Sequence, residues 1–193
     1  MIKIKTTADK LVYMNRFVSK EATRYYLQGV YFEPEGLKLI STDGHRLGIY
    51  DDAFTVSEEI EGEFKGLIIK FNKEFLSELK SMKNKEITLT IKNKDIMSID
   101  APVVIDGSFN QVGIVINADY PHWQNVIPDE SRPTPMTEIG INPDYLKDFK
   151  PDKKHYGVKM EFFSNRNGIG YAPIKISVID MPKFTGYVMP VRY

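Results

Sequence analysis

The stretch STDGHRLGIY, residues 41–50, reads as two β-strands joined by a tight turn. Asp43 and Gly44 form an Asp-Gly pair, a strong signal for a turn between antiparallel strands. Ser41, Asp43 and His45 are too close in sequence on an extended segment to converge as a catalytic group. The stretch therefore predicts a rigid hairpin whose turn can serve as a binding surface, and no bond-making chemistry.

The composition around this hairpin limits the possible classes of protein. The 193 residues are 42% hydrophobic, enough for a packed core, and 26 Lys and Arg balance 26 Asp and Glu. A neutral total argues against a strongly basic nucleic-acid binder, although basic residues can still gather on one face. No cysteine is present, which excludes disulfides, thiolate metal sites and thiol catalysis. The start of the sequence has no signal-peptide pattern and no run is long enough for a membrane span, so we expect a cytoplasmic protein.

Other candidate chemical motifs are weak. His45, His122 and His155 show no metal-ligand spacing. The segment NGIGY, residues 167–171, contains a Gly-x-Gly without a following helix, so a turn between strands is favoured over a phosphate loop. We therefore expect no metal, no cofactor and no enzymatic activity.

Outward from the hairpin, one order of elements occurs three times: a strand, a helix, and three more strands. The expected strands cover 1–7, 25–33, 37–42, 45–51, 66–72, 86–93, 96–104, 111–118, 137–142, 156–163, 174–180 and 184–193. The expected helices cover 8–20, 73–82 and 143–149, with Asn72 as an N-cap and Pro143 in a first turn after Asn142. This order predicts an α+β fold of three strand-helix-three-strand units, with helices on one face of antiparallel sheets. Two units can pair to bury their apolar faces, which leaves the third in need of a partner.

Four segments resemble a known family in the right order along the chain. They are TRYYLQGVYFE at 23–33, STDGHRLGIY at 41–50, DYPHWQNVIP at 119–128 and YVMPVRY at 187–193. Together they resemble the bacterial DNA polymerase III beta sliding clamp. That resemblance implies a DNA-clamp fold of three similar domains, each built from two units. Residues 1–128 resemble a complete middle domain, with units at about 1–62 and 63–128, and residues 129–193 resemble the second half of the last domain.

In that family, a pocket between the middle and last domains binds short peptides of polymerases, clamp loader and repair proteins. The resemblance places the following residues in such a pocket: Leu27, Thr42, Gly44, His45, Arg46, Leu47, Pro121, Trp123, Val126, Val188, Met189, Pro190, Val191 and Arg192. The chain departs from the family pattern in two places. Gln124 and Asn125 stand where the family has two arginines, and Tyr193 stands where it ends in leucine. Trp123 has two interpretations, a ring that packs on a hairpin and a ring that borders the groove.

Clamp helices touch duplex DNA through sparse basic side chains without reading its sequence. The corresponding candidates here are Arg16, Lys20, Arg24, Lys73, Lys80, Lys83, Lys147 and Lys150. A merely solvated helix face has the same appearance, and acidic residues such as Glu74 and Asp144 dilute the charge.

Two hypotheses from different classes follow. The first is a DNA polymerase processivity factor that encircles duplex DNA as a homo-oligomer and binds peptides of polymerase and clamp loader. The clamp ring contains twelve units, so four chains of three units match that number. The alternative is a peptide-binding module, such as a phage protein, that acts as a decoy or regulator and never closes around DNA.

Overall fold

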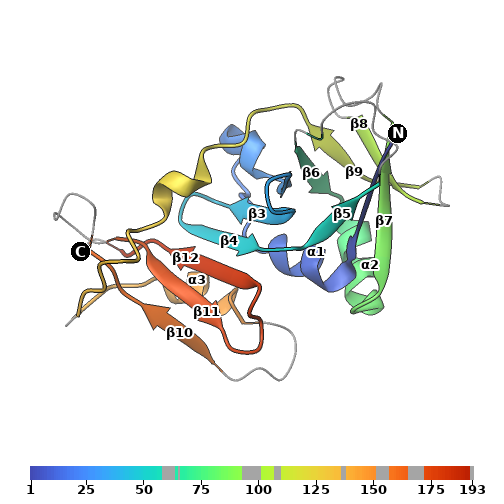
Figure 1. Cartoon of the computed structure of the whole chain (residues 1–193). Coiled ribbons are helices and arrows are strands. Elements are labelled where there is room, and N and C mark those ends of the chain that lie inside the picture. The colour runs from blue at the N-terminus through green and yellow to red at the C-terminus, as the bar shows by residue number, and fades with distance from the viewer. Residues whose placement is uncertain are drawn as a thin grey trace.

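The computed structural model describes residues 1–57, 64, 66–92, 101–106, 110–135, 138–150, 157–164 and 172–191. The described strands form one antiparallel sheet in the order β10-β11-β12-β4-β3-β2-β6-β9-β8-β7-β1-β5. The N-terminal strand lies at one end of the molecule, and the residues after 138 lie at the other (Figure 1). No helix within the described ranges is long and apolar enough to cross a membrane.

The elements follow the chain in this order. The strands are β1 (Ile2–Thr7), β2 (Val30–Glu33), β3 (Lys38–Thr42), β4 (Arg46–Tyr50), β5 (Phe54–Val56), β6 (Leu67–Phe71), β7 (Glu86–Ile91), β8 (Ala101–Ile105), β9 (Gln111–Ile116), β10 (Val158–Glu161), β11 (Ile174–Val178) and β12 (Phe184–Val188). The helices are α1 (Ala8–Met14), α2 (Lys73–Met82) and α3 (Pro143–Lys147), with 3₁₀ turns η1 (Ala22–Leu27) and η3 (Trp123–Val126).

Two helices begin where their capping residues predict. The Asn72 side chain accepts a hydrogen bond from the Phe75 N–H, and the Asn142 side chain accepts one from the Asp144 N–H. Each amide oxygen satisfies a donor that the first helical turn leaves unpaired. Helix α2 covers the residues expected for it, and Phe75 and Leu79 form its buried stripe.

Other expected boundaries are wrong. Helix α1 ends at Met14 and does not reach residue 20, because the chain turns and the Ser19 N–H bonds the Leu27 carbonyl at 2.8 Å. The strand expected over 25–33 starts only at Val30, since its first half forms the η1 turn. The strand expected over 137–142 is reduced to an isolated bridge between Gly140 and Val191. Strand β5 was not expected.

The first two units exchange their first strands. Strand β1 of the first unit pairs with β7 of the second, with Ile4 opposite Leu89. Strand β6 of the second unit pairs with β2 of the first, with Ile69 opposite Val30. Each first strand thus completes the sheet of the other unit, and helices α1 and α2 pack on each other. This reciprocal exchange interlocks the first two units.

The third unit joins the first along β12 and β4. These strands pair antiparallel, with Gly186 opposite Gly48. A cluster of buried rings lies beneath the seam and draws on both units: Tyr13, Phe17, Phe149 and Phe184. The Phe17 and Phe149 ring centroids are 5.0 Å apart, and the Tyr13 hydroxyl donates to the Phe149 carbonyl at 2.7 Å. One continuous apolar core therefore spans the seam between the first and third units.

Candidate functional site

The turn of residues 42–46 is held by its own side chains. Asp43 Oδ1 accepts from the main-chain N–H groups of His45 and Arg46, at 2.9 and 2.8 Å. The Thr42 hydroxyl accepts from the Gly44 N–H at 3.0 Å and donates to the Arg46 carbonyl at 2.6 Å. Gly44 has a φ of +88°, a backbone conformation that favours glycine. The tight turn expected from the sequence is present, and its shape is fixed internally.

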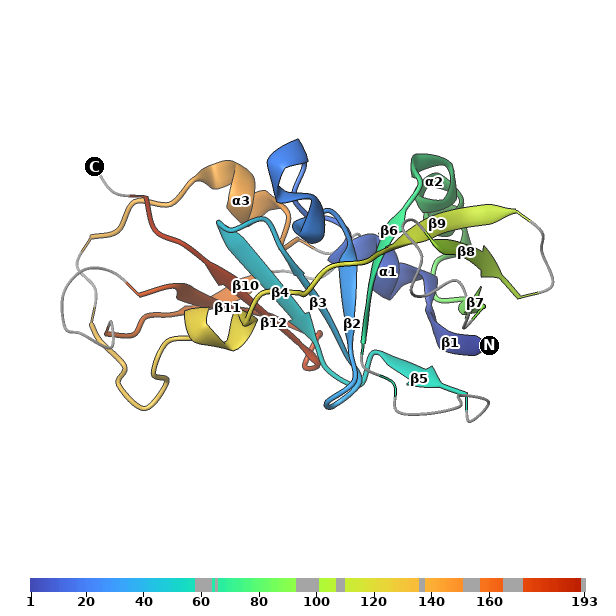
Figure 2. The ribbon, with the colours of Figure 1, turned by 90° about the horizontal axis from the view of Figure 1, so that it is seen from above.

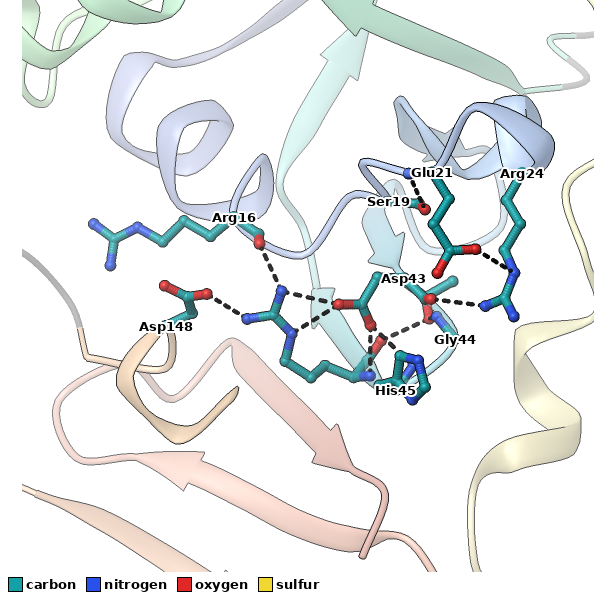
Figure 3. A network of polar contacts seen from close by, with 10 residues as sticks. Arg16, Ser19, Glu21, Arg24, Asp43, Gly44, His45 and Asp148 are labelled. Atoms are coloured by element: carbon teal, nitrogen blue, oxygen red, sulfur yellow. Dashed lines mark hydrogen bonds and ion pairs between the residues drawn. The ribbon is translucent and has the colours of Figure 1, made fainter. Parts of the chain in front are cut away.

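Arg46 is buried and lies at the centre of a polar network that joins three parts of the chain. Figure 3 labels its partners Arg16, Asp43 and Asp148. Its guanidinium donates to Asp43 at 2.9 and 3.1 Å, to the Arg16 carbonyl at 3.2 Å, and to Asp148, which follows α3. The side chain is 8% exposed. Charged hydrogen bonds in such a setting are stronger than those between neutral groups. Arg46 therefore fixes the turn against both α1 and the third unit.

The C-terminal segment continues the seam past β12 and meets the same turn. The Met189 N–H donates to the His45 carbonyl at 2.8 Å, and the Val191 N–H donates to the Gly140 carbonyl at 2.8 Å. The exposed His45 ring stacks on Tyr145 of α3, with ring centroids 5.4 Å apart. Residues far apart in the sequence thus form one surface at this end of the β4–β12 seam.

This surface contains a partly open cavity of about 60 Å³, which we call the docking hollow. Its lining combines the turn, the 3₁₀ turn η3 and the third unit: Thr42, Gly44, His45, Arg46, Leu47, Val126, Pro173, Tyr187 and Met189. Val126 is 46% exposed and Met189 is 39% exposed. Cofactor pockets are several times larger, so the hollow fits a short apolar side chain better than a cofactor.

A hydrogen-bonded carboxylate anchors the floor of the docking hollow. The Tyr187 hydroxyl donates to Glu130 Oε1 at 2.7 Å, and Lys175 forms an ion pair with the same carboxylate. Burial raises the pKa of Tyr187, and the bond to Glu130 raises it further. Burial alone would raise the pKa of Glu130, but the bonds from Lys175 and Tyr187 outweigh it and hold that pKa below its usual value. Tyr187 is therefore a neutral hydroxyl held in one position.

The structure brings together seven of the residues that the resemblance placed in a pocket. Thr42, Gly44, His45, Arg46, Leu47, Val126 and Met189 all line the docking hollow. That they bind a peptide remains a prediction.

The other candidates, apart from Trp123, are absent from the lining of the docking hollow or lie outside the described residues. Val188 is fully buried in the main core on the opposite face of β12, and Leu27 is also buried. Pro121, Pro190 and Val191 are outside the lining, and Arg192 and Tyr193 lie outside the described residues.

Of the two interpretations of Trp123, the structure shows a ring that packs on an apolar cluster. Its half-buried ring rests on a second apolar cluster formed by Ile40, Leu47, Ile49 and Tyr187. The Lys38 ammonium lies 5.9 Å from the ring centroid. The ring lies outside the lining of the docking hollow and supports the segment that carries Val126.

Sequence reasoning missed two lining residues, Tyr187 and Pro173. A signal for Tyr187 was present, because residues two apart in a strand share a face and Met189 was already a candidate. The same alternation places Val188 on the other face. Pro173 precedes β11, and nothing in the sequence marks it as near the turn of residues 42–46.

The candidate DNA-facing residues differ in their exposure and in their contacts within the chain. Lys20, Lys73, Lys80, Lys83, Lys147 and Lys150 are exposed. Arg24 instead forms an ion pair with Glu21 and donates to the Asp43 carbonyl at 3.0 Å, while Arg16 donates to the Lys150 carbonyl. Helices α2 and α3 lie along the same side of the ribbon, with α1 between them (Figure 2). Lys20 and the exposed lysines on and after α2 and α3 are thus the remaining candidates for a basic surface.

Two other features of the described residues do not form a site. A wide concavity of about 550 Å³ borders only Pro128, Asp129, Glu130 and Arg132, which form a single open turn. The described ranges contain no cluster of three or more His, Cys, Asp or Glu able to hold a metal ion.

Comparisons with known proteins identify the fold. No family model matches the sequence, and no curated protein matches it. Among solved structures, the chain is similar to the DNA polymerase sliding clamp of Pseudomonas aeruginosa, with a TM-score of 0.67 and 16% identity over 100% of this chain and 66% of that one. The DNA polymerase III beta subunit of Thermotoga maritima gives a TM-score of 0.62 and 16% identity over 100% and 66%. The Bartonella birtlesii sliding clamp bound to griselimycin gives a TM-score of 0.59 and 18% identity over 99% of this chain and 66% of that one.

These similarities confirm the predicted DNA-clamp fold for the whole chain, which spans about 66% of the length of those clamps.

Proposed function

We propose that this chain, which has the fold of the bacterial beta sliding clamps, is a clamp-like processivity factor for a DNA polymerase. Its oligomer encircles duplex DNA in the cytoplasm, and the docking hollow binds short peptides of the polymerase and of a clamp loader. The chain performs no catalysis. It acts by effective concentration, since a tethered polymerase rebinds its template before it can diffuse away.

The observation that carries this proposal is the docking hollow at the end of the β4–β12 seam. Its wall is formed by three segments distant in sequence, and the Met189–His45 main-chain bond closes it. Exposed Val126 and Met189 offer apolar contact next to a turn fixed by Arg46. An adaptable methionine on a rigid frame is typical of peptide-binding grooves.

The expected ligand is a peptide in which glutamine is followed by leucine and phenylalanine. One of its apolar side chains enters the space between Leu47, Val126 and Met189. A hollow this small supports micromolar affinity, a binding free energy of roughly −8 kcal/mol.

Fluorescence anisotropy with a labelled peptide of this kind tests the hollow. Met189→Ala combined with deletion of Tyr193 is expected to weaken binding at least about tenfold, because the variant loses apolar contact. Ile179→Ala is the matched control, since Ile179 is 51% exposed on a different part of the third unit and should leave the affinity unchanged. Equal affinities in both variants would place the peptide site elsewhere.

The decoy hypothesis remains the second candidate, and one observation favours it. The chain retains the docking hollow while spanning about 66% of the length of the clamps that it resembles. A closed ring is retained on circular DNA and lost when that DNA is cut, whereas a decoy binds peptide and is indifferent to DNA topology. Gel filtration of the chain with nicked circular DNA, before and after linearisation, separates the two hypotheses.

A further inference from the structure

The third unit has two strand edges that lack the partner present in the other units. Inside residues 1–128, each first strand pairs with the strand that follows the helix of the other unit, as β1 does with β7 and β6 with β2. In the third unit, residues 138–142 occupy the place of a first strand, because they end at Asn142 as β6 ends before Asn72. Strand β10 follows helix α3 and occupies the place of β7 and β2.

Strand β10 is an edge strand of the sheet. It pairs with β11 and has no second strand partner among the described residues. The Ile179 N–H donates to the Gly157 carbonyl, so Gly157 directs its main-chain groups toward β11. Because these groups alternate along a strand, those of Val158 and Met160 point away from β11.

Residues 132–134, which connect the second and third units, pair with the chain only just past the end of β10, at residues 162–164. The Thr134 N–H donates to the Phe162 carbonyl, and the Ser164 N–H donates to the Arg132 carbonyl. The open part is therefore the stretch around Val158 and Met160, whose side chains are both half-buried. An open edge of this kind accepts another strand unless it is protected.

Residues 138–142 also lack a strand partner on one side among the described residues. Their bridge is from Gly140 to Val191, with the Gly140 carbonyl accepting the Val191 N–H. In an extended segment, the main-chain groups of Ile139 and Ile141 then point to the other side, where no described residue pairs with them. In the first unit, that side of β1 is covered by β7.

We propose that a second copy of this chain completes the third unit by reciprocal strand exchange. Residues 138–140 of each copy pair antiparallel with β10 of the other about a two-fold axis, as β1 and β7 pair within one chain. The inference gives the oligomer of the proposed function, on which it rests, a defined contact.

The internal pairings also indicate the register. Asn142, Asn72 and Thr7 hold the same place before the helix of each unit, so Ile139 corresponds to Ile69 and Ile4, which pair with Val30 and Leu89. Gly186, Gly48 and Gly113 likewise hold the same place in the third strand after the helix of each unit. When the units are aligned in this way, Ile139 lies opposite Val158 or Met160. The connecting segment already occupies the edge at 162–164, which favours Val158. In that register the exposed Glu138 lies opposite the exposed Lys159, a pairing of opposite charges. Ile139 and Val158 then face each other with main-chain groups that both point into the interface.

A first experiment measures the mass of the full chain by light scattering at micromolar concentration. Val158→Pro removes an outward N–H without removing a bond to β11, and proline is tolerated at such edge positions. We expect this variant to have half the mass of the wild-type assembly. A monomeric wild-type chain, or an unchanged mass in a folded Val158→Pro variant, would overturn the proposal.

The same samples are tested with the labelled peptide. The docking hollow does not include β10, so Val158→Pro should bind peptide with wild-type affinity. If Val158→Pro halves the mass of the assembly but leaves peptide affinity unchanged, only the contact between copies has been lost. A monomeric wild-type chain that binds peptide overturns the strand exchange and supports the decoy hypothesis.

A second experiment does not depend on proline being tolerated. The native chain has no cysteine, so single cysteines can be introduced without background. Ile139→Cys and Val158→Cys chains of different size are mixed and oxidised, and a non-reducing gel is expected to show the mixed disulfide, because directly opposed residues lie within disulfide reach. Thr55→Cys, exposed on β5, replaces Val158→Cys as the control. A mixed product no more abundant than in the control would contradict the exchange.

Discussion

The guanidinium of Arg46 explains why the turn of residues 42–46 contains so many charged side chains. It binds Asp43 within the turn, Asp148 after α3, and the Arg16 carbonyl beyond α1. The rings of Phe17 and Tyr145 lie 5.6 and 5.1 Å from it. The charges therefore fix the shape of the docking hollow, and the exposed His45 ring lies at its border.

Removing this guanidinium should be costly. Arg46→Ala leaves Asp43, which is 14% exposed, without its cation, and we expect the free energy of unfolding to fall by about 3 kcal/mol in urea denaturation. Lys147→Ala is the control, because Lys147 and Asp144 are 74% and 81% exposed, and it should change stability by less than about 0.5 kcal/mol. Similar losses in the two variants would show that the network is not structural.

Glu33 gives stability a dependence on pH. Its side chain is buried, and its Oε2 has no hydrogen-bond partner. Burial, and then the nearby Glu35, raises its pKa above the usual value. A raised carboxyl pKa stabilises the fold below the unfolded pKa, and this contribution is lost as pH rises through the folded pKa.

Glu33→Gln should therefore raise the melting temperature at pH 7, and the difference should disappear toward about pH 4. Calorimetry across this range measures the effect. Glu78→Gln on the exposed face of α2 is the control and should show no such trend. A destabilised Glu33→Gln variant at pH 7 would mean that the charged form is favoured.

The turn could be predicted at this scale because it depends on local chemistry, whereas the seven lining residues of the docking hollow that were predicted came from the resemblance. Asp43 and Gly44 specify a turn wherever they occur between strands, and the resemblance added Met189. The role of Arg46 as a buried ion-pair centre could not be predicted, since Asp148 is about a hundred residues away along the chain. Because alternate residues of a strand share a face, the candidate Met189 predicts that Tyr187, and not Val188, lies on the side of the docking hollow.

At the scale of elements, helix starts were more predictable than strand ends. Asn72 and Asn142 cap their helices by bonds to residues two or three positions away, so the sequence contains the whole interaction. The early end of α1 depends instead on the bond between Ser19 and Leu27 and on the burial of Phe17 beneath the seam. Such tertiary contacts override local helical preference.

Strand β12 depends on a glycine to pack against Phe149, which follows α3. A Cβ at Gly186 would clash with Cε1 of the Phe149 ring, so Gly186→Ala should cost about 1–3 kcal/mol in urea denaturation. Phe149→Leu provides space for the new methyl group. The double variant should therefore be less destabilised than the sum of the two single variants. Strict additivity would exclude contact between the two positions.

At the scale of the whole molecule, the order of elements could be predicted but not how they connect. The threefold pattern indicated the units, while the exchange of β1 and β6 between units depends on pairings 85 and 39 positions apart, as in Ile4 with Leu89 and Ile69 with Val30. Nothing local specifies such partners. The position of the third unit beside β4 came from the resemblance alone.

The proposed DNA surface makes a prediction at this scale. Replacing Lys73, Lys80 and Lys83 by alanine should weaken DNA binding for all sequences alike and flatten its dependence on salt, since each lost phosphate contact reduces the slope by about 0.9. Lys92→Ala, at an exposed position after β7, is the control. Filter binding over a series of salt concentrations measures both slopes, and equal slopes would exclude α2 from the DNA contact.

The opposed glycines of β4 and β12 have a mechanical consequence. Gly48 makes room for Phe17 and Gly186 for Phe149, so the two rings touch directly below the paired strands. Bending at that point would pull the rings apart and admit water between them, which makes the joint stiff. We therefore expect the first and third units to move together, and in the proposed assembly we expect any gate through which a DNA duplex enters to lie where one chain meets the next.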